Sequence, residues 1–147
     1  MTRFAAPLVL VLLAGCPTSS GEPPAEFSDC GAQVSAGYDI VDNDTGGAGA
    51  AWIEGDTLSV SVAYGGGCEE HLFSICWDGG FAESDPVQVD LSLWHGGTPD
   101  MCEAMIYETR TFDLAPLKDA WHASYGAGAG TITVHLEGAS DLEYSFE

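Results

Sequence analysis

Two segments with alternating apolar and polar residues, joined by a turn-rich loop, most strongly constrain how this chain folds. Residues 71–77 and 87–95 both alternate with the period of two that is typical of a β-strand. Residues 78–86 between them are rich in Gly, Asp, Ser and Pro, which favour turns. We therefore expect an antiparallel β-hairpin in the middle of the chain.

The apolar positions of the two strands also indicate a register for this hairpin. Pairing Phe73 with Leu93 keeps the apolar residues of both strands on one face, whereas a slip of one residue would separate them. In that register His71 lies opposite His95, with their Cβ atoms about 5 Å apart. The hairpin therefore predicts two histidines close together at one of its ends.

Two cysteines lie beyond the same end of the hairpin. One precedes His71 by three residues and the other follows His95 by seven residues. We therefore expect a cluster formed by Cys68, His71, His95 and Cys102.

The N-terminus has the features of an export signal. A short basic region at residues 1–3 precedes an apolar run at residues 5–14, which is too short to span a bilayer permanently. The run closes with Leu13-Ala14-Gly15-Cys16, which resembles the bacterial lipobox. The resemblance implies cleavage before Cys16 and attachment of lipid chains, palmitate among them, to Cys16. An ordinary signal peptide with a chance cysteine is the alternative.

These features predict the domain organisation. Residues 1–15 are expected to be a lipoprotein signal peptide. Residues 16–28, which include several Pro, Ser and Gly residues and have no hydrophobic period, are expected to be the lipidated cysteine and a flexible tether. Residues 29–147 are long enough for one domain with a single core. The lipid would attach this domain to the membrane of the bacterial cell envelope, at the outer membrane or cell surface rather than the inner membrane.

The charge of the chain excludes some partners. Its formal net charge is −20, with 23 Asp and Glu against 3 Lys and Arg. Such a charge repels nucleic acids and anionic lipid headgroups. The acidic residues are scattered, which favours a solvated surface over a cation site or a surface for a basic partner. The densest cluster, residues 39–46, lacks the residue order of an EF-hand, so we interpret it as a turn, with calcium as an alternative.

Four cysteines remain if Cys16 is lipidated, and four cysteines allow three pairings. We favour Cys68 with Cys102, because both lie at the same end of the hairpin. The side chain of Cys76 points to the opposite face, where Cys30 in the entry segment can reach it, so we expect a second disulfide between these two.

The cluster at the end of the hairpin has three interpretations. A disulfide between its cysteines, with the histidines packed nearby, is favoured because exported thiols usually oxidise. A metal site is the second, because His71, His95, Cys68 and Cys102 match ligand sets for zinc or copper. A Cys–His nucleophile pair is the third, with Asp100 or Glu103 orienting the imidazole; it requires a free thiol with a lowered pKa.

The rest of the chain predicts further short strands. Alternation or β-forming residues occur at 34–41, 51–53, 58–64, 104–112, 131–136 and 142–146, and one short helix or turn is expected at 113–121. We predict an all-β fold: a single antiparallel β-sandwich of about seven or eight strands, compatible with an immunoglobulin-like layout.

Part of this pattern resembles NigD-like bacterial lipoproteins. The matching residues are Tyr64-Gly65-Gly66-Gly67-Cys68 with His71 and Phe73, His95 with Asp100-Met101-Cys102-Glu103-Ala104, and Phe112-Asp113-Leu114. They cover roughly a third of the chain. The resemblance implies a secreted, β-rich lipoprotein domain with no established reaction. It also ties both cysteines and both histidines to one motif.

These observations lead to one functional hypothesis and one alternative. We expect a lipid-anchored binding or structural module of the envelope that is not an enzyme. Its expected partner is an unknown envelope protein or a small ligand. The alternative is a lipoprotein that binds zinc or copper through the Cys68/His71/His95/Cys102 cluster. A Cys–His hydrolase is the remaining and more distant hypothesis.

Overall fold

The computed structural model describes residues 30, 36–42, 50–97 and 100–147. These residues form eight strands and one helix, in the order β1 (Asp39–Ile40), β2 (Ala51–Glu54), β3 (Thr57–Gly66), β4 (His71–Cys76), β5 (Val87–Gly97), β6 (Ala104–Asp113), α1 (Ala115–Tyr125), β7 (Gly130–Leu136) and β8 (Leu142–Phe146). The prediction of an all-β fold of about eight strands is confirmed.

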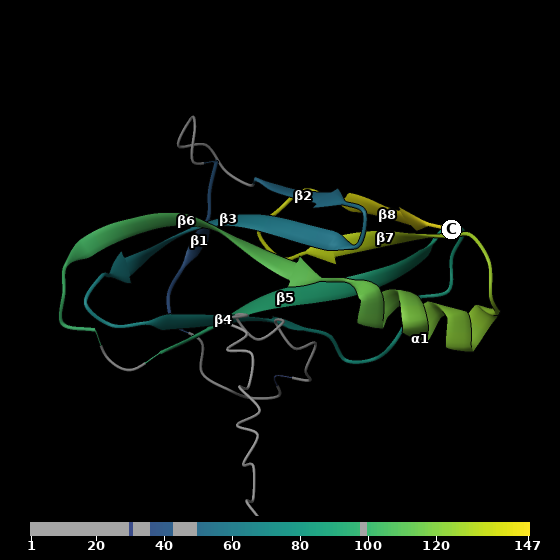
Figure 1. Cartoon of the computed structure of the whole chain (residues 1–147), viewed down its shortest axis with the longest axis horizontal. Coiled ribbons are helices and arrows are strands. Elements are labelled where there is room, and N and C mark those ends of the chain that lie inside the picture. Colours follow the sequence, from purple (N-terminus) through teal and green to yellow (C-terminus); the bar gives the residue numbers. More distant parts are fainter. Residues whose placement is uncertain (1–29, 31–35, 43–49, 98–99) are drawn as a thin grey trace, which may run out of the picture.

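The first sheet is built around β3, in which residues 58–64 are all buried. Strand β6 pairs antiparallel with the whole length of β3, from Thr57 opposite Asp113 to Gly66 opposite Ala104. Strands β1 and β2 pair with successive parts of the other edge of β3. Figure 1 shows β3 and β6 running together toward the end of the molecule that is far from α1. This pairing holds Gly66 and the residues after it at that end.

The second sheet has the strand order β4-β5-β7-β8. Strands β4 and β5 form the predicted antiparallel hairpin, and β7 and β8 form another. Strands β5 and β7 are parallel, with Val87 next to Ile132 and Leu91 next to Leu136. This sheet is therefore mixed, because the chain passes through β6 and α1 before it returns to lie beside β5.

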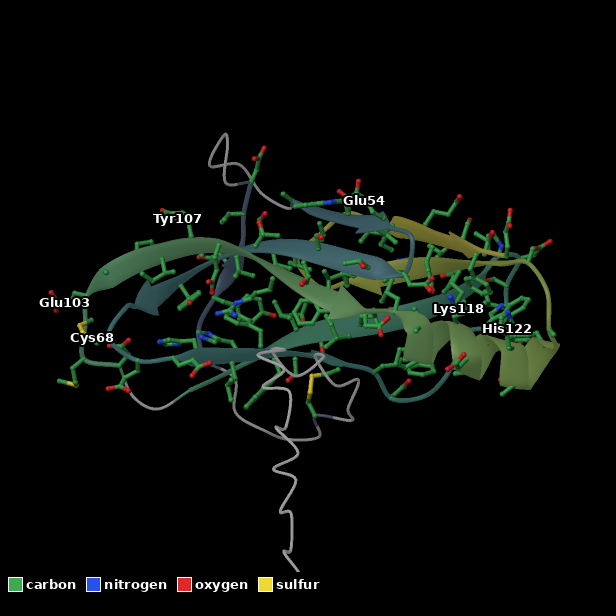
Figure 2. The ribbon with its side chains drawn as sticks, viewed as in Figure 1. Glu54, Cys68, Glu103, Tyr107, Lys118 and His122 are labelled. Carbon is green, nitrogen blue, oxygen red and sulfur yellow. A yellow bond between two sulfur atoms is a disulfide. The ribbon has the colours of Figure 1, made fainter. Side chains whose placement is uncertain are left out.

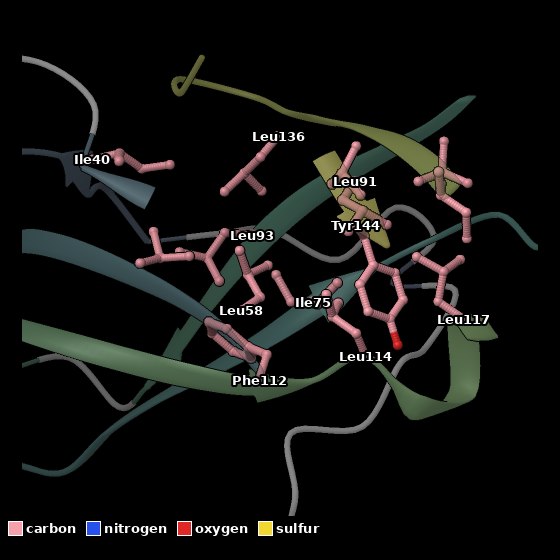
Figure 3. Packing of buried hydrophobic residues seen from close by; sticks show 14 of the residues in the cluster. Ile40, Leu58, Ile75, Leu91, Leu93, Phe112, Leu114, Leu117, Leu136 and Tyr144 are labelled. Carbon is pink, nitrogen blue, oxygen red and sulfur yellow. The ribbon is translucent and has the colours of Figure 1, made fainter. Parts of the chain in front are cut away.

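The hydrophobic core fills the space between the two sheets. Alternate side chains of β3 point into it, and Leu58, Val60 and Val62 are fully buried. Figure 3 shows how side chains from both sheets and from the start of α1 pack together there. Burial of each large aliphatic side chain contributes about 1.5–3 kcal/mol to folding. The remaining members of the core include Ile75, Val89, Leu91, Leu93, Phe112, Leu114, Leu117, Ile132, Val134, Leu136 and Tyr144.

Helix α1 closes one end of the sandwich, as Figure 1 shows. The Asp113 carboxylate accepts a hydrogen bond from the backbone N–H of Ala115 at 2.8 Å, and a proline lies in the first turn. Leu117 anchors the helix in the core. The helix continues to Tyr125, four residues further than the sequence predicts, and ends at Gly126 with a φ of 100°. Such a positive φ suits glycine.

The β4–β5 register differs from the predicted one by two residues. Phe73 pairs with His95 and His71 with Gly97, so the predicted pairing of Phe73 with Leu93 is wrong. A slip of two residues keeps every side chain on its predicted face, because side chains alternate with a period of two. The hydrophobic pattern therefore fits both registers. His71 and His95 become diagonal neighbours across the strands instead of opposite ones.

Some predictions concern residues outside those that the structure describes. The signal peptide, the lipobox with Cys16 and the tether fall in residues 1–29, and the second half of the acidic turn considered for calcium, residues 43–46, falls in residues 43–49. The predicted first strand at 34–41 is described only from residue 36, and its paired part is Asp39–Ile40. Within the described ranges, the only helix is too short to cross a bilayer.

Candidate functional site: the cysteine–histidine cluster

Cys68 and Cys102 form a disulfide at the end of the sandwich far from α1. Their Cα atoms are 5.8 Å apart, and the bond joins the loop after β3 to the segment before β6. Figure 2 shows Cys68 and Glu103 at this end and His122 of α1 at the other. This is the pairing that the sequence analysis favours.

A second disulfide joins Cys30 to Cys76, with their Cα atoms 5.4 Å apart. It attaches the entry segment to the last residue of β4. This pair, too, matches the expected one. All four cysteines that follow residue 29 are therefore bonded in pairs.

The two histidines of the cluster are buried and contact each other. His71 is 7% exposed and His95 is 1% exposed. Nδ1 of His71 lies 2.8 Å from Nε2 of His95, which is a hydrogen-bond distance. Nδ1 of His95 also lies 3.2 Å from the carbonyl oxygen of Gly37. Burial lowers the pKa of His95, mainly because a charged imidazole would lose its hydration there.

Asp100 organises the loops around this pair. Its Oδ2 accepts hydrogen bonds from the backbone N–H groups of residues 67–69, at 2.8, 2.9 and 3.0 Å. Its Oδ1 accepts a hydrogen bond from the backbone N–H of Cys102 at 2.8 Å. Nε2 of His71 lies 3.3 Å from the same Oδ2. One carboxylate therefore joins both cysteine loops to the histidine pair.

These hydrogen bonds hold the pKa of Asp100 well below its usual range, with the bond from Cys102 the largest cause. Each backbone N–H stabilises the ionised carboxylate and would lose that interaction on protonation. Asp100 is therefore a permanent anion at neutral pH. Its position next to His71 favours a proton on Nε2 of that imidazole.

The number of protons in this chain of contacts follows from its geometry. An acceptor lies at each end, Asp100 at one and the Gly37 carbonyl at the other, with the two imidazoles between them. Three hydrogen bonds require three N–H protons, whereas two neutral imidazoles supply two. While both imidazoles are neutral, the three contacts therefore share two protons.

Aromatic and charged side chains enclose the histidines. The Phe73 ring stacks on His95 with the ring centroids 4.3 Å apart and the planes 2° from parallel, and the Tyr64 ring lies within 5 Å of both imidazoles. Arg110 lies over Phe73 and donates a hydrogen bond to the carbonyl oxygen of His71 at 3.3 Å. These contacts make the pair part of the hydrophobic interior.

A glycine allows the loop to approach this closely. A Cβ atom on Gly66 would come within 2.6 Å of Nε2 of His71 and 2.8 Å of Oδ2 of Asp100, and Gly66 has a φ of 150°. Any side chain at this position would meet the hydrogen-bonded pair directly. The Gly65-Gly66-Gly67 run therefore has a local steric function.

The predicted metal ligands do not have the arrangement of a metal site here. Around a tetrahedral zinc with bonds of about 2.0 Å, ligand nitrogens are held roughly 3.3 Å apart and both aim at the ion. The two facing histidine nitrogens are instead 2.8 Å apart. Possible ligand atoms of Cys68, Asp100 and Cys102 lie within 4.8 Å of one another, but both sulfur atoms are bonded in the disulfide. Zinc or copper binding stays a prediction.

The nucleophile hypothesis meets a similar obstacle. A catalytic cysteine attacks as a free thiolate, and Cys68 and Cys102 are joined to each other. Glu103, one of the two residues considered for orienting an imidazole, is exposed. Asp100, the other, does contact His71, yet four backbone N–H groups share its oxygens. These contacts indicate that the Asp100 carboxylate connects the two cysteine loops to each other.

The comparisons with known proteins identify no family for this chain. No family model and no curated protein matches it, so the resemblance to NigD-like lipoproteins stays a prediction. A crystal structure from Parabacteroides distasonis ATCC 8503, described as that of a "Putative TOXIN related protein", is similar with 18% sequence identity and a TM-score of 0.45. The match covers 77% of this chain and 52% of that protein, so this chain spans about half of its length. A similarity at this level indicates no shared function.

Proposed function

We propose that this chain is a lipid-anchored module of the bacterial cell envelope that acts outside the cytoplasm in binding or in structure and catalyses no reaction. In this proposal Cys16 carries the anchor and the cysteine–histidine cluster maintains the fold. The lipid supplies the contact with the membrane, and an envelope protein or a small ligand is the partner.

The observation that supports this proposal most is that the groups of the cluster bond to one another. Both cysteines are in a disulfide, and Asp100 accepts hydrogen bonds from both of their loops. Among the described residues, every buried side-chain nitrogen or oxygen has a hydrogen-bond partner. A site that binds substrate needs groups that are free to contact it, whereas a structural cluster has its groups satisfied.

The disulfides also support a location outside the cytoplasm. Structural disulfides persist in oxidising compartments such as the periplasm and the cell surface, and are rare in the cytosol. The segment from Leu13 to Cys16 supplies the matching export and lipidation signal. A strongly negative charge makes nucleic acid an unsuitable partner.

The anchor can be tested by metabolic labelling with an alkyne analogue of palmitate in a bacterial host. The wild-type chain should take up the label and sediment with membranes, and Cys16→Ser should lose both properties. Ser19→Ala is the matched control, because it changes a nearby hydroxyl and keeps the lipobox. Label in Cys16→Ser, or an unlabelled wild type, would contradict the proposal.

A further inference from the structure

A second part of the molecule, far from the cysteine–histidine cluster, has the properties of a ligand site. A hollow of about 780 Å³ lies between α1, strands β7 and β8 and the segment that leads into β5. Small-molecule sites usually have volumes of about 300–1,000 Å³. We call this hollow the α1 groove. It is lined by residues 84–87, Trp121, Tyr125, residues 129–131, Glu143, Ser145 and Phe146.

Aromatic rings form the apolar part of the α1 groove. Trp121 and Tyr125 are one turn apart on α1, with ring centroids 5.5 Å from each other, and the Phe146 ring lies 5.3 Å from Trp121. A Cβ atom on Gly130 would come within 2.8 Å of both Trp121 and Phe146. The absence of a side chain at Gly130 therefore lets these two rings meet beside the groove.

The charged part of the α1 groove is entirely acidic. Among the described residues that line it, Asp85 and Glu143 are the only charged ones, and both are exposed. Glu83 lies just outside and accepts a hydrogen bond from the hydroxyl of Tyr125 at 2.9 Å. The two basic residues that follow residue 3, Arg110 and Lys118, form ion pairs elsewhere, with Glu108 and Asp56. In the part of the chain that the structure describes, no Lys or Arg therefore neutralises the carboxylates of the groove.

We propose that the α1 groove binds an organic cation, an amine or quaternary ammonium compound with an apolar body. Aromatic ring faces attract cations, and the two carboxylates supply the opposite charge. The apolar body of such a ligand would pack against the rings. A net charge of −20 raises the local concentration of cations and repels anionic ligands such as phosphates.

This inference goes beyond the proposed envelope module, because it assigns a ligand class to a surface that the anchor and the cysteines do not involve. A lipid-anchored chain that binds no cation in this groove would overturn only the present inference. A chain that binds the cation but lacks the anchor would overturn only the proposed attachment. The two proposals can therefore fail separately.

The experiment is a titration of the exported chain, in a nonionic detergent, with benzylammonium chloride. Its neutral counterpart, benzyl alcohol, has the same ring and nearly the same size but no charge. Binding is followed by the indole N–H resonances of the tryptophans, with Trp121 assigned by Trp121→Phe. We expect the Trp121 resonance to move with a Kd on the order of 1 mM, and benzyl alcohol to bind at least about fivefold more weakly. Added salt should weaken the binding.

Charge-neutral variants separate the groove from the overall charge of the protein. The double variant Asp85→Asn/Glu143→Gln should weaken benzylammonium binding about five- to tenfold and leave benzyl alcohol unaffected. Glu103→Gln, at the opposite end of the sandwich in Figure 2, changes the same type of exposed carboxylate and should leave the Kd unchanged.

Three results would overturn the proposal. One is equal affinity for benzylammonium and benzyl alcohol, which would identify an apolar groove without charge selectivity. Another is a loss of binding free energy per removed charge that is equal for Glu103→Gln and for the double variant, which would indicate only non-specific attraction. The last is an unchanged Trp121 resonance, in a sample whose spectrum is that of a folded protein.

Discussion

His71 and His95 are joined side chain to side chain, with 2.8 Å between Nδ1 of one and Nε2 of the other, although they are not opposite each other in the hairpin. The imidazole of His71 reaches diagonally across β4 and β5. The other ring nitrogen of His71, Nε2, contacts the Asp100 carboxylate. The other ring nitrogen of His95, Nδ1, contacts the carbonyl oxygen of Gly37. Four predictions follow from this arrangement and from the loops around it.

The first prediction concerns pH. Because the pKa of His95 is lower in the folded protein than the ordinary value of about 6.5, the unfolded chain binds more protons at this residue at acidic pH. The contribution of His95 to stability is therefore complete above about pH 6.5 and is lost as the pH falls below it. One group can contribute a slope of at most about 1.4 kcal/mol per pH unit.

Urea unfolding between pH 8 and pH 5 measures this slope. The variant His95→Gln, which keeps a polar side chain and cannot titrate, should have a smaller loss of stability on acidification than the wild type. Identical slopes in the two proteins would contradict the prediction. A steeper loss of stability in the variant than in the wild type would mean that His95 gains a proton more readily in the folded protein than in the unfolded chain.

The second prediction concerns the glycine beside the histidine pair. Gly66→Ala should destabilise the protein by about 2–3 kcal/mol, since its Cβ would overlap His71 and Asp100 at a positive φ. Gly65→Ala is the matched control, because a Cβ at Gly65 has no atom within 4 Å. Thermal unfolding of both variants measures the effect. Equal melting temperatures for the two would show that the loop has more space than its contacts indicate.

The third prediction concerns the disulfides. The exported chain should have a mass four hydrogens lower than the fully reduced chain and should not react with iodoacetamide in its native state. Removing one bond with Cys68→Ala/Cys102→Ala should cost about 3–4 kcal/mol, the chain-entropy value for a loop of 34 residues. Mass spectrometry and urea unfolding measure the two quantities. A mass lower by only two hydrogens would mean that one pair remains reduced.

The fourth prediction concerns metals. Because the facing nitrogens of His71 and His95 bond to each other, zinc or copper salts should not raise the melting temperature, and chelator should not lower it. The comparison needs the oxidised wild type and His71→Ala/His95→Ala. A metal-dependent rise in the wild type that the double variant loses would restore the metal-binding hypothesis and would require the imidazoles to turn.

The sequence predicts the strands well where polar and apolar residues alternate. Strand β3 and the β4–β5 hairpin follow directly from this alternation, and so does the side of the sheet on which His71, His95 and Cys76 lie. The register of the hairpin does not follow from the alternation, because pairing Phe73 with His95 instead of Leu93 leaves the same residues facing the core. The close packing of His95 on Phe73 distinguishes the two registers, and it depends on contacts that no alternation encodes.

The role of Asp100 was only partly predictable. From the sequence, Asp100 is a candidate partner for an imidazole, but nothing in the sequence indicates that it accepts hydrogen bonds from four backbone N–H groups. Its bond to the N–H of Cys102, two residues on, is a local Asx-type contact that aspartate favours in turns. Its bonds to residues 67–69 join segments more than thirty residues apart, which the pairings of β3 with β6 and of β4 with β5 bring together.

Asp100 and the disulfide between Cys68 and Cys102 close the same end of the sandwich by different chemistry. A reductant can open the sulfur bond and leaves the carboxylate unaffected, whereas strong acid neutralises the carboxylate and leaves the sulfur bond intact. Two independent interactions, the disulfide and the hydrogen bonds of Asp100, thus connect the loops at this end, and loss of one leaves the other in place. We therefore expect this end of the domain to stay closed when either the redox state or the acidity of its surroundings changes, and to open most readily when both change together.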